Sequence, residues 1–105
     1  MTDKGLRVYN LLKKIPLGKV TTYGIIAEKL GLNPRDVGKI LGKNEHPLEY
    51  PCYKVVRSDG RLGGYTINGR NDKSTLIVKV NKLLSDGIKL NGEKVNKKFF
   101  YRFDK

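Results

Sequence analysis

A chain of 105 residues forms one domain, because single hydrophobic cores usually span roughly 50 to 200 residues. Its 38% hydrophobic residues can fill a modest core, and no apolar run approaches the ~18 residues of a membrane span. One cysteine excludes an internal disulfide and a cysteine-based zinc site, and the chain opens without an apolar run of the signal-peptide type. A net charge of +12 favours polyanions, with nucleic acid first and an acidic membrane surface second. We therefore expect an intracellular polyanion-binding protein.

The first elements predicted are three helices. Apolar residues recur at three- and four-residue steps near the start, and Pro16 and Gly18 would end this first helix. Thr21 or Thr22 can cap a second helix, which Gly31 closes. Asn33 and Pro34 then read as the cap and first residue of a third helix, so that the second and third helices form a helix-turn-helix. The apolar residues assigned to the three inner faces are Leu6, Val8, Tyr9, Leu11, Leu12, Ile15, Ile26, Ala27, Leu30, Val37, Ile40 and Leu41.

The pattern changes to extended structure between Tyr50 and Tyr65. Tyr53, Val55 and Val56 favour a strand, and the residues Ser58-Asp59-Gly60 supply a turn before Leu62-Gly63-Gly64-Tyr65. This segment is predicted to be a hairpin or wing, with Cys52 at its base.

The last helix is expected from about Lys73 to Asp86, before Gly87. Its apolar face would hold Leu76, Ile77, Val80, Leu83 and Leu84. The Lys-rich tail is either a small strand pair, using Ile88, Leu90, Val95, Phe99 and Tyr101, or a basic arm, and its lysines are expected to be mostly solvated.

Several motifs in register carry a resemblance to a known family. They are GKVTTYG at residues 18–24, Arg35-Asp36-Val37-Gly38, Asn44, Pro51-Cys52-Tyr53-Lys54-Val55-Val56, Ser58-Asp59-Gly60 and Leu62-Gly63-Gly64-Tyr65. Together they resemble the C-terminal domain of the O6-alkylguanine-DNA alkyltransferases. The short chain and its ending are similar to the single-domain branch that includes the alkyltransferase-like proteins.

The resemblance implies a single-turnover reaction in which the Cys52 thiolate takes the alkyl group from O6-alkylguanine and keeps it, with O4-alkylthymine as a second candidate substrate. A thiol needs a lowered pKa or a nearby base for this, and the net positive charge and Lys54 would favour the thiolate. The family normally has a histidine after the cysteine, oriented by a glutamate, where this chain has Tyr53 and Asp86. By the same resemblance Asn44 would hold the turn before the cysteine and hydrogen-bond the relay. His46, the only histidine, is a possible substitute base.

The resemblance also implies that the damaged base is turned out of the duplex. Arg35 would enter the base stack and Tyr23 would contact the flipped nucleotide. The predicted DNA-contacting residues are Thr22, Tyr23, Gly24, Asn33, Arg35 and Ser58, and the predicted pocket for the base and alkyl group consists of Pro47, Val55, Gly63, Tyr65 and Thr66.

These inferences give a mainly α fold with a small β wing, of the helix-turn-helix, winged-helix-like kind. The segments are a first helix at 1–17, the helix-turn-helix at 18–44, an active-site loop and wing at 45–66, a loop and last helix at 67–87 and a basic tail at 88–105. The expected partner is double-stranded DNA containing O6-alkylguanine. We expect no cofactor, no metal, no membrane contact, a monomer, and a location in the cytoplasm with the nucleoid, or in the nucleus of a eukaryote.

Two alternatives remain. A lesion sensor of the alkyltransferase-like kind would flip and mark the base without accepting its alkyl group. Cys52 argues against this sensor, whereas Tyr53 and the short chain favour it. A winged-helix transcription regulator would explain the charge and the helices but not the Pro-Cys and Gly-Gly-Tyr elements.

Overall fold

The computed structural model describes residues 2–46, 49–67 and 69–103. Its helices are α1 (Asp3–Leu12), α2 (Tyr23–Leu30), α3 (Pro34–Gly42) and α4 (Lys73–Ser85), with 3-10 turns η1 (Cys52–Lys54) and η2 (Lys97–Phe99). Its strands are β1 (Thr21–Thr22), β2 (Val55–Val56), β3 (Leu90–Asn91) and β4 (Lys94–Val95). The prediction of a mainly α fold with small β elements is confirmed. No helix among the described residues is long and apolar enough to cross a membrane.

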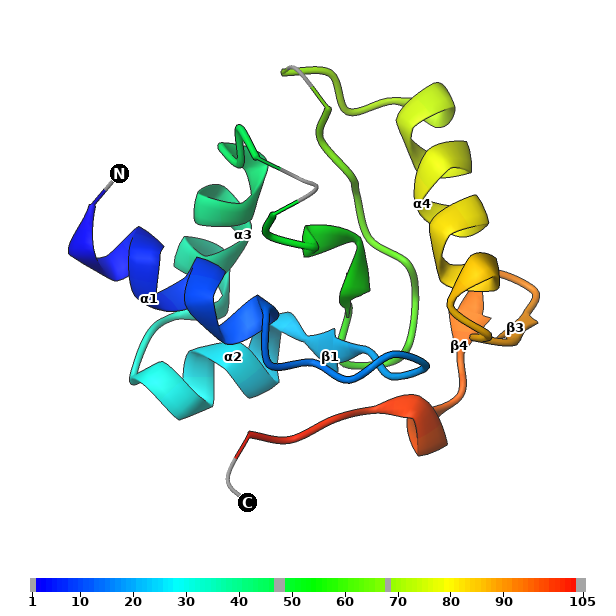
Figure 1. The fold of residues 1–105 in the computed structure, drawn as a ribbon, viewed down its shortest axis with the longest axis horizontal. Helices are drawn as coiled ribbons and strands as arrows, with labels where there is room; N and C mark the ends of the chain where they lie inside the picture. The colour runs from blue at the N-terminus through cyan, green and yellow to red at the C-terminus, as the bar shows by residue number, and fades with distance from the viewer. Residues whose placement is uncertain (1, 47–48, 68, 104–105) are drawn as a thin grey trace.

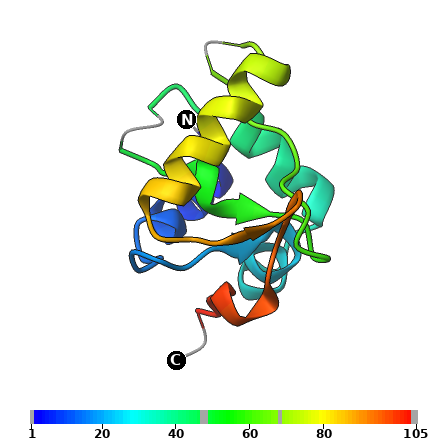
Figure 2. The same ribbon diagram turned by 90° about the vertical axis from the view of Figure 1, so that its right-hand side faces the viewer.

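The helices lie on two sides of a central segment. Figure 1 shows α1, α2 and α3 grouped on one side and α4 on the other, with η1 and β2 between them. Turned by 90°, α4 lies across the face of the molecule, above the strands (Figure 2). The segment that carries Cys52 is therefore covered from both sides.

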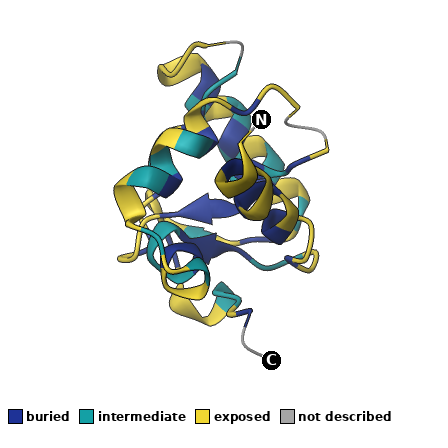
Figure 3. Ribbon diagram, turned by 90° about the vertical axis from the view of Figure 1, so that its left-hand side faces the viewer, coloured by how far each residue is buried: buried dark blue, intermediate teal, exposed yellow. Residues whose placement is uncertain are grey.

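The core consists of two neighbouring clusters of buried side chains. One joins α1, α2 and α3 to η1 and includes Val8, Leu12, Ile26 and Val37. The other lies beneath α4 and the tail and includes Leu83. Figure 3 shows buried strands in the middle of the molecule and helices exposed along their outer sides.

Capping signals explain the boundaries of α2 and α3. The Thr22 side chain accepts a hydrogen bond from the Ile25 amide, and Gly31 ends α2 with a φ of 69°, a left-handed conformation that glycine adopts readily. Asn33 caps α3, and Pro34 is its first residue. The predicted helix-turn-helix is confirmed at both of its helices.

The first helix is shorter than predicted. It ends at Leu12, because Lys14 and Ile15 turn away through bonds from their amides to the carbonyls of Leu11 and Leu12, at 3.0 and 3.2 Å. Leu6, which was assigned to the inner face, is 41% exposed. The prediction of a helix reaching residue 17 was therefore wrong.

The expected hairpin after Cys52 is also different. Strand β2 pairs in parallel with β1, with Thr21 opposite Val55 and Thr22 opposite Val56. The turn at 58–60 is present, but the chain leaving it bonds the tail, where the Val95 amide donates to the Gly60 carbonyl at 2.8 Å. Both valines of β2 are fully buried, so their strand lies inside the molecule rather than in a projecting ribbon.

The tail is a strand pair that continues into a packed segment. Strands β3 and β4 are antiparallel, as one of the two alternatives predicted. Beyond them the Val20 amide donates to the Phe99 carbonyl at 2.9 Å, and Phe103 is buried in the core. The described tail is thus part of the folded domain, although most of its lysines are exposed.

Candidate active site

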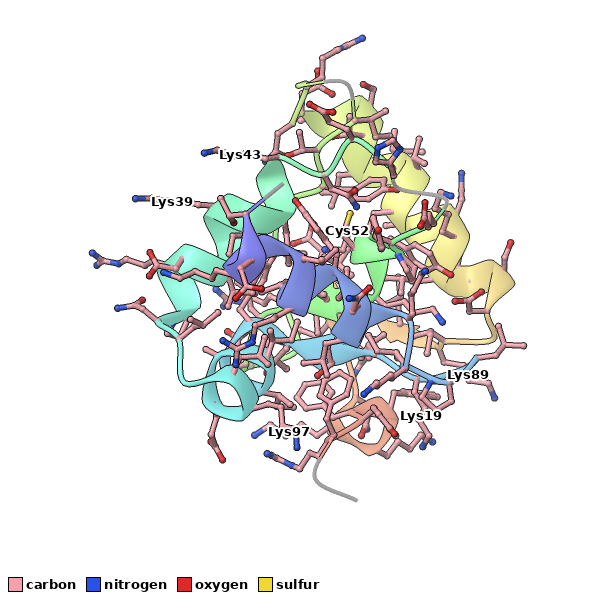
Figure 4. The ribbon with its side chains drawn as sticks, turned by 60° about the vertical axis from the view of Figure 1, so that its left-hand side comes forward. Lys19, Lys39, Lys43, Cys52, Lys89 and Lys97 are labelled. Carbon is pink, nitrogen blue, oxygen red and sulfur yellow. The ribbon has the colours of Figure 1, made fainter. Side chains whose placement is uncertain are left out.

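Cys52 lies at the start of η1, in the middle of the molecule. The preceding residues bend the chain so that the Cys52 amide donates to the Tyr50 carbonyl at 2.8 Å. Its side chain is only 6% exposed, and Figure 4 shows it inside the molecule between α3 and α4. Access to the sulfur is therefore controlled by the residues around it.

Asn44 holds this bend, but no hydrogen bond from it to Tyr53 is present among the described residues. Its side-chain amide donates to the Tyr50 carbonyl at 2.8 Å, and its oxygen accepts from the His46 amide at 2.9 Å. Asn44 thus links the end of α3 to the residue two positions before the cysteine.

Opposing effects act on the Cys52 thiol. Burial raises its pKa, because the thiolate loses contact with water, while a hydrogen bond from Asn44 and the charges of Lys79 and Lys82 lower it in part. Lys54 does not act as predicted, since its ammonium bonds the Ile15 carbonyl at 3.3 Å and lies 3.9 Å from Asp86. The helpful charge comes from α4 instead.

Lys79 is the residue that the sequence patterns missed. It is fully buried on α4, and its ammonium donates to the carbonyls of Val55 at 2.8 Å, Gly64 at 3.1 Å and Leu62. Burial lowers the pKa of Lys79 to about 8, although the negative charge of a Cys52 thiolate acts in the other direction and raises it. The one sequence signal for its burial was its position four residues from both Thr75 and Leu83, which places the three side chains on one face of the helix.

The buried face of α4 is rotated from the predicted one because this lysine has three carbonyl acceptors, two of them on the buried residues Val55 and Leu62. Thr75, Lys79 and Leu83 point inward, whereas Ile77 is 61% and Leu84 is 51% exposed. The assignment of Ile77 and Leu84 to the buried face was wrong. A polar residue that finds its full set of partners can occupy a core position.

Tyr53 and Asp86 are brought together, although 33 positions separate them. The Tyr53 hydroxyl donates to an Asp86 carboxylate oxygen at 2.5 Å. Burial and this bond raise the pKa of Tyr53, so the phenol keeps its proton at neutral pH. Tyr53 therefore cannot act as a resident phenolate base.

A pocket of about 120 Å³ opens onto Cys52. Its walls are Tyr23, Gly38, Leu41, Gly42, Cys52, Gly64, Tyr65, Thr66 and Asn71. Burial raises the pKa of Tyr23 and takes that of Tyr65 to about 12, so both phenols are hydrogen-bond donors. The pocket thus offers two hydroxyl donors and the sulfur to one small ligand.

The predicted pocket residues divide into three groups. Tyr65 and Thr66 line the pocket. Val55 is fully buried and Gly63 lies against Tyr23, where a Cβ would come within 3.2 Å of its hydroxyl, so neither forms the wall. Pro47 lies outside the described residues. Asn71, which no pattern had indicated, completes the wall.

His46 is not directed to this pocket. It lines a separate groove of about 560 Å³ between α1 and the end of α3, together with Lys39 and Lys43. Its ring meets Tyr50 edge-on at 6.4 Å. The geometry therefore gives no support to His46 as a substitute base.

The predicted DNA-contacting residues lie near the start of α2 and α3. Arg35 is exposed in the first turn of α3, and the Ser58 hydroxyl lies close to Gly24, where a Cβ would be 3.1 Å from it. Thr22 and Asn33 use their side-chain oxygens as caps. Lys39 and Lys43 extend from α3 on one side in Figure 4. An exposed cationic helix thus lies next to the mouth of the Cys52 pocket.

Among the described residues no group of three or more His, Cys, Asp or Glu side chains could hold a metal ion.

Residues 4–81 match the family model described as 6-O-methylguanine DNA methyltransferase, DNA binding domain. The chain belongs to this family. The match runs from α1 into α4 and includes Cys52, the pocket and the helix-turn-helix. The family resemblance in the sequence is confirmed.

Curated relatives carry names from the same chemistry. A bifunctional methyltransferase/endonuclease from Picrophilus torridus is 40% identical over 99 residues, which cover 92% of this chain and 30% of that protein. A methylated-DNA–protein-cysteine methyltransferase from Methanocaldococcus jannaschii is 40% identical over 85 residues, covering 81% of this chain and 49% of that protein. The chain thus spans less than half the length of these relatives.

Solved structures of family members share the fold. The O6-methylguanine-DNA methyltransferase of Pyrococcus kodakaraensis superposes with a TM-score of 0.72 at 34% identity, over 84% of this chain and 48% of that one. S. pombe Atl1, solved with damaged DNA containing O6-carboxymethylguanine, superposes with a TM-score of 0.78 at 23% identity, over 97% of this chain and 98% of Atl1. At that identity the Atl1 match is a statement about fold alone.

Proposed function

We propose that this family member is a DNA repair protein that transfers the alkyl group of O6-alkylguanine irreversibly to Cys52. The observation that carries the proposal is a single pocket in which a cysteine, two phenol donors and glycine-lined walls meet beside an exposed helix-turn-helix. This arrangement suits a flipped purine whose O6 substituent points at the sulfur.

The proposed step balances as a nucleophilic displacement. The thiolate sulfur attacks the alkyl carbon, an S–C bond forms, and the C–O6 bond breaks with its electron pair going to the guanine. The thiol proton leaves towards solvent or the Tyr53–Asp86 pair, and a phenol of the pocket donates to the purine. No cofactor takes part, and each molecule reacts once because the thioether is stable.

DNA is the proposed partner, bound through α2 and α3. Arg35 would occupy the gap left by the extruded base, while Tyr23, on both α2 and the pocket wall, would guide the nucleotide inward. Gly24 and Ser58 would approach the backbone together. We expect the chain to act as a monomer, in the cytoplasm with the nucleoid or in the nucleus of a eukaryote.

One experiment decides between transfer and sensing. The protein is incubated with a duplex carrying O6-methylguanine, digested, and the peptide containing Cys52 is weighed. We expect the mass of one added methylene, and no added mass in Cys52→Ser. Tight binding to the lesion with no mass change would instead identify a sensor. Tyr53, which stands where the family normally has a histidine, favours that alternative.

The pH dependence of the thiol gives a second test. Because burial raises the pKa of Cys52, the thiolate fraction is small at neutral pH and grows with pH. The rate of alkylation by iodoacetamide should still be rising at the ordinary thiol value of 9.0. A rate that levels off below pH 8 would mean that the lysines outweigh burial.

A further inference from the structure

The loop between Thr66 and α4 delivers Asn71 to the mouth of the pocket. Before Asn71, Ile67 and Arg70 exchange two backbone hydrogen bonds, both at 2.9 Å. After it, Asp72 caps α4 and accepts from the Arg70 guanidinium at 2.9 Å. The backbone of Asn71 is thus held between two anchored neighbours, while the residue itself is exposed.

The Asn71 amide covers Gly64 on the opposite wall. A Cβ at position 64 would lie 2.6 Å from Nδ2 and 2.9 Å from Oδ1 of Asn71, closer than real contacts allow. An alanine at position 64 would therefore require the Asn71 amide to move, and Gly64 itself has no positive φ. No hydrogen bond between the Asn71 amide and another described residue is present, and Asn71 is one of the residues that line the pocket.

We propose that Asn71 determines the specificity of the pocket and restricts it to small alkyl groups such as methyl. This inference rests on the proposed function. Asn71 is one of the residues that line the pocket of about 120 Å³, and its amide occupies the space beside Gly64. A benzyl group would have to displace this amide from Gly64 without offering a hydrogen bond in return.

The test compares duplexes carrying O6-methylguanine and O6-benzylguanine. Rates of mass gain at Cys52 are measured for the wild type, for Asn71→Ala and for Asn71→Ala combined with Gly64→Ala. We expect the methyl-to-benzyl rate ratio to fall about tenfold in Asn71→Ala. The added methyl group of Gly64→Ala refills the vacated space and should return the ratio towards that of the wild type.

Asn10→Ala is the matched control, because Asn10 is an exposed asparagine on α1 away from the pocket. Its ratio should equal that of the wild type. An unchanged ratio in Asn71→Ala, in protein whose circular dichroism and melting temperature match the wild type, would overturn the proposal, as would a double variant that stays open to benzyl.

A second readout separates this inference from the proposed function. The same duplexes are titrated against all variants in a Cys52→Ser background, and the ratio of dissociation constants is determined. If the wild type gains no mass, transfer fails as a function, but a tenfold change in the affinity ratio still supports Asn71 as the selector. An affinity ratio that Asn71→Ala leaves unchanged in that case would overturn it.

Discussion

The helix-turn-helix and the surroundings of Cys52 are held by hydrogen bonds of different range. In α2 and α3, the side chains of Thr22 and Asn33 accept from amides three and two positions ahead. Around Cys52, Lys79 reaches carbonyls 15 to 24 positions away, and Tyr53 reaches a carboxylate 33 positions away. The first region can form from local signals, whereas the second exists only when α4 is docked.

Replacing Lys79 should break the second region with the largest effect. Lys79→Met leaves the carbonyls of Val55, Leu62 and Gly64 without a buried donor, and we expect a loss of at least about 3 kcal/mol of unfolding free energy. Urea denaturation measures it. Lys73→Met, an exposed lysine of the same helix, is the control and should cost less than about 0.5 kcal/mol. Equal losses of unfolding free energy in the two variants would show that the buried bonds of Lys79 do not stabilise this region.

For Arg35, in the first region, the expected effect is on DNA binding and not on the stability of the fold. Arg35→Ala should weaken binding of a duplex lesion about thirtyfold, in keeping with a few kcal/mol for extruding a base. Alkyl transfer from free O6-methylguanine should keep its wild-type rate, because no stack has to be opened. Fluorescence anisotropy and mass spectrometry give the two values, and an equal loss on both substrates would contradict the base-flipping role.

Tyr53 distinguishes a structural from a proton-transfer role within the second region. Tyr53→Phe removes the bond to Asp86 and should cost about 1.5 to 3 kcal/mol of stability, since that acceptor is charged. It should also slow transfer, while Tyr53→His preserves or speeds it. Single-turnover kinetics compare the three proteins, and identical rates would remove Tyr53 from the mechanism.

Removing a local cap should have the smallest effect. Asn33→Ala deletes the acceptor for the Arg35 amide at the start of α3, which typically costs about 1 kcal/mol. Asn33→Asp retains an acceptor and should restore the stability. Thermal denaturation gives both values. A loss in Asn33→Ala as large as that in Lys79→Met would show that the two regions do not differ as described.

Much of the first region could be read from the sequence because its signals are short-range. Thr22, Gly31 and Asn33 fall where the caps were predicted, and the last helix begins at Lys73 as expected. In the site, the contact between Tyr53 and Asp86 was anticipated only through the family's histidine and glutamate. The partner of β2 was missed, since a two-residue strand carries no mark of what it pairs with.

The sequence by itself determined the family and the positions of α2, α3 and α4, and it singled out Cys52 as the candidate nucleophile, because motifs and helix caps are written in neighbouring residues. Tertiary structure alone decided which charges act on Cys52, that Lys79 is buried, and that Asn71 lines the pocket. These depend on the docking of α4 and its preceding loop against β2 and the residues that follow it. The net charge of +12 predicted an electrostatic field that favours the Cys52 thiolate. In the structure the charges that lower the pKa of Cys52 are those of two nearby lysines on α4, Lys79 and Lys82.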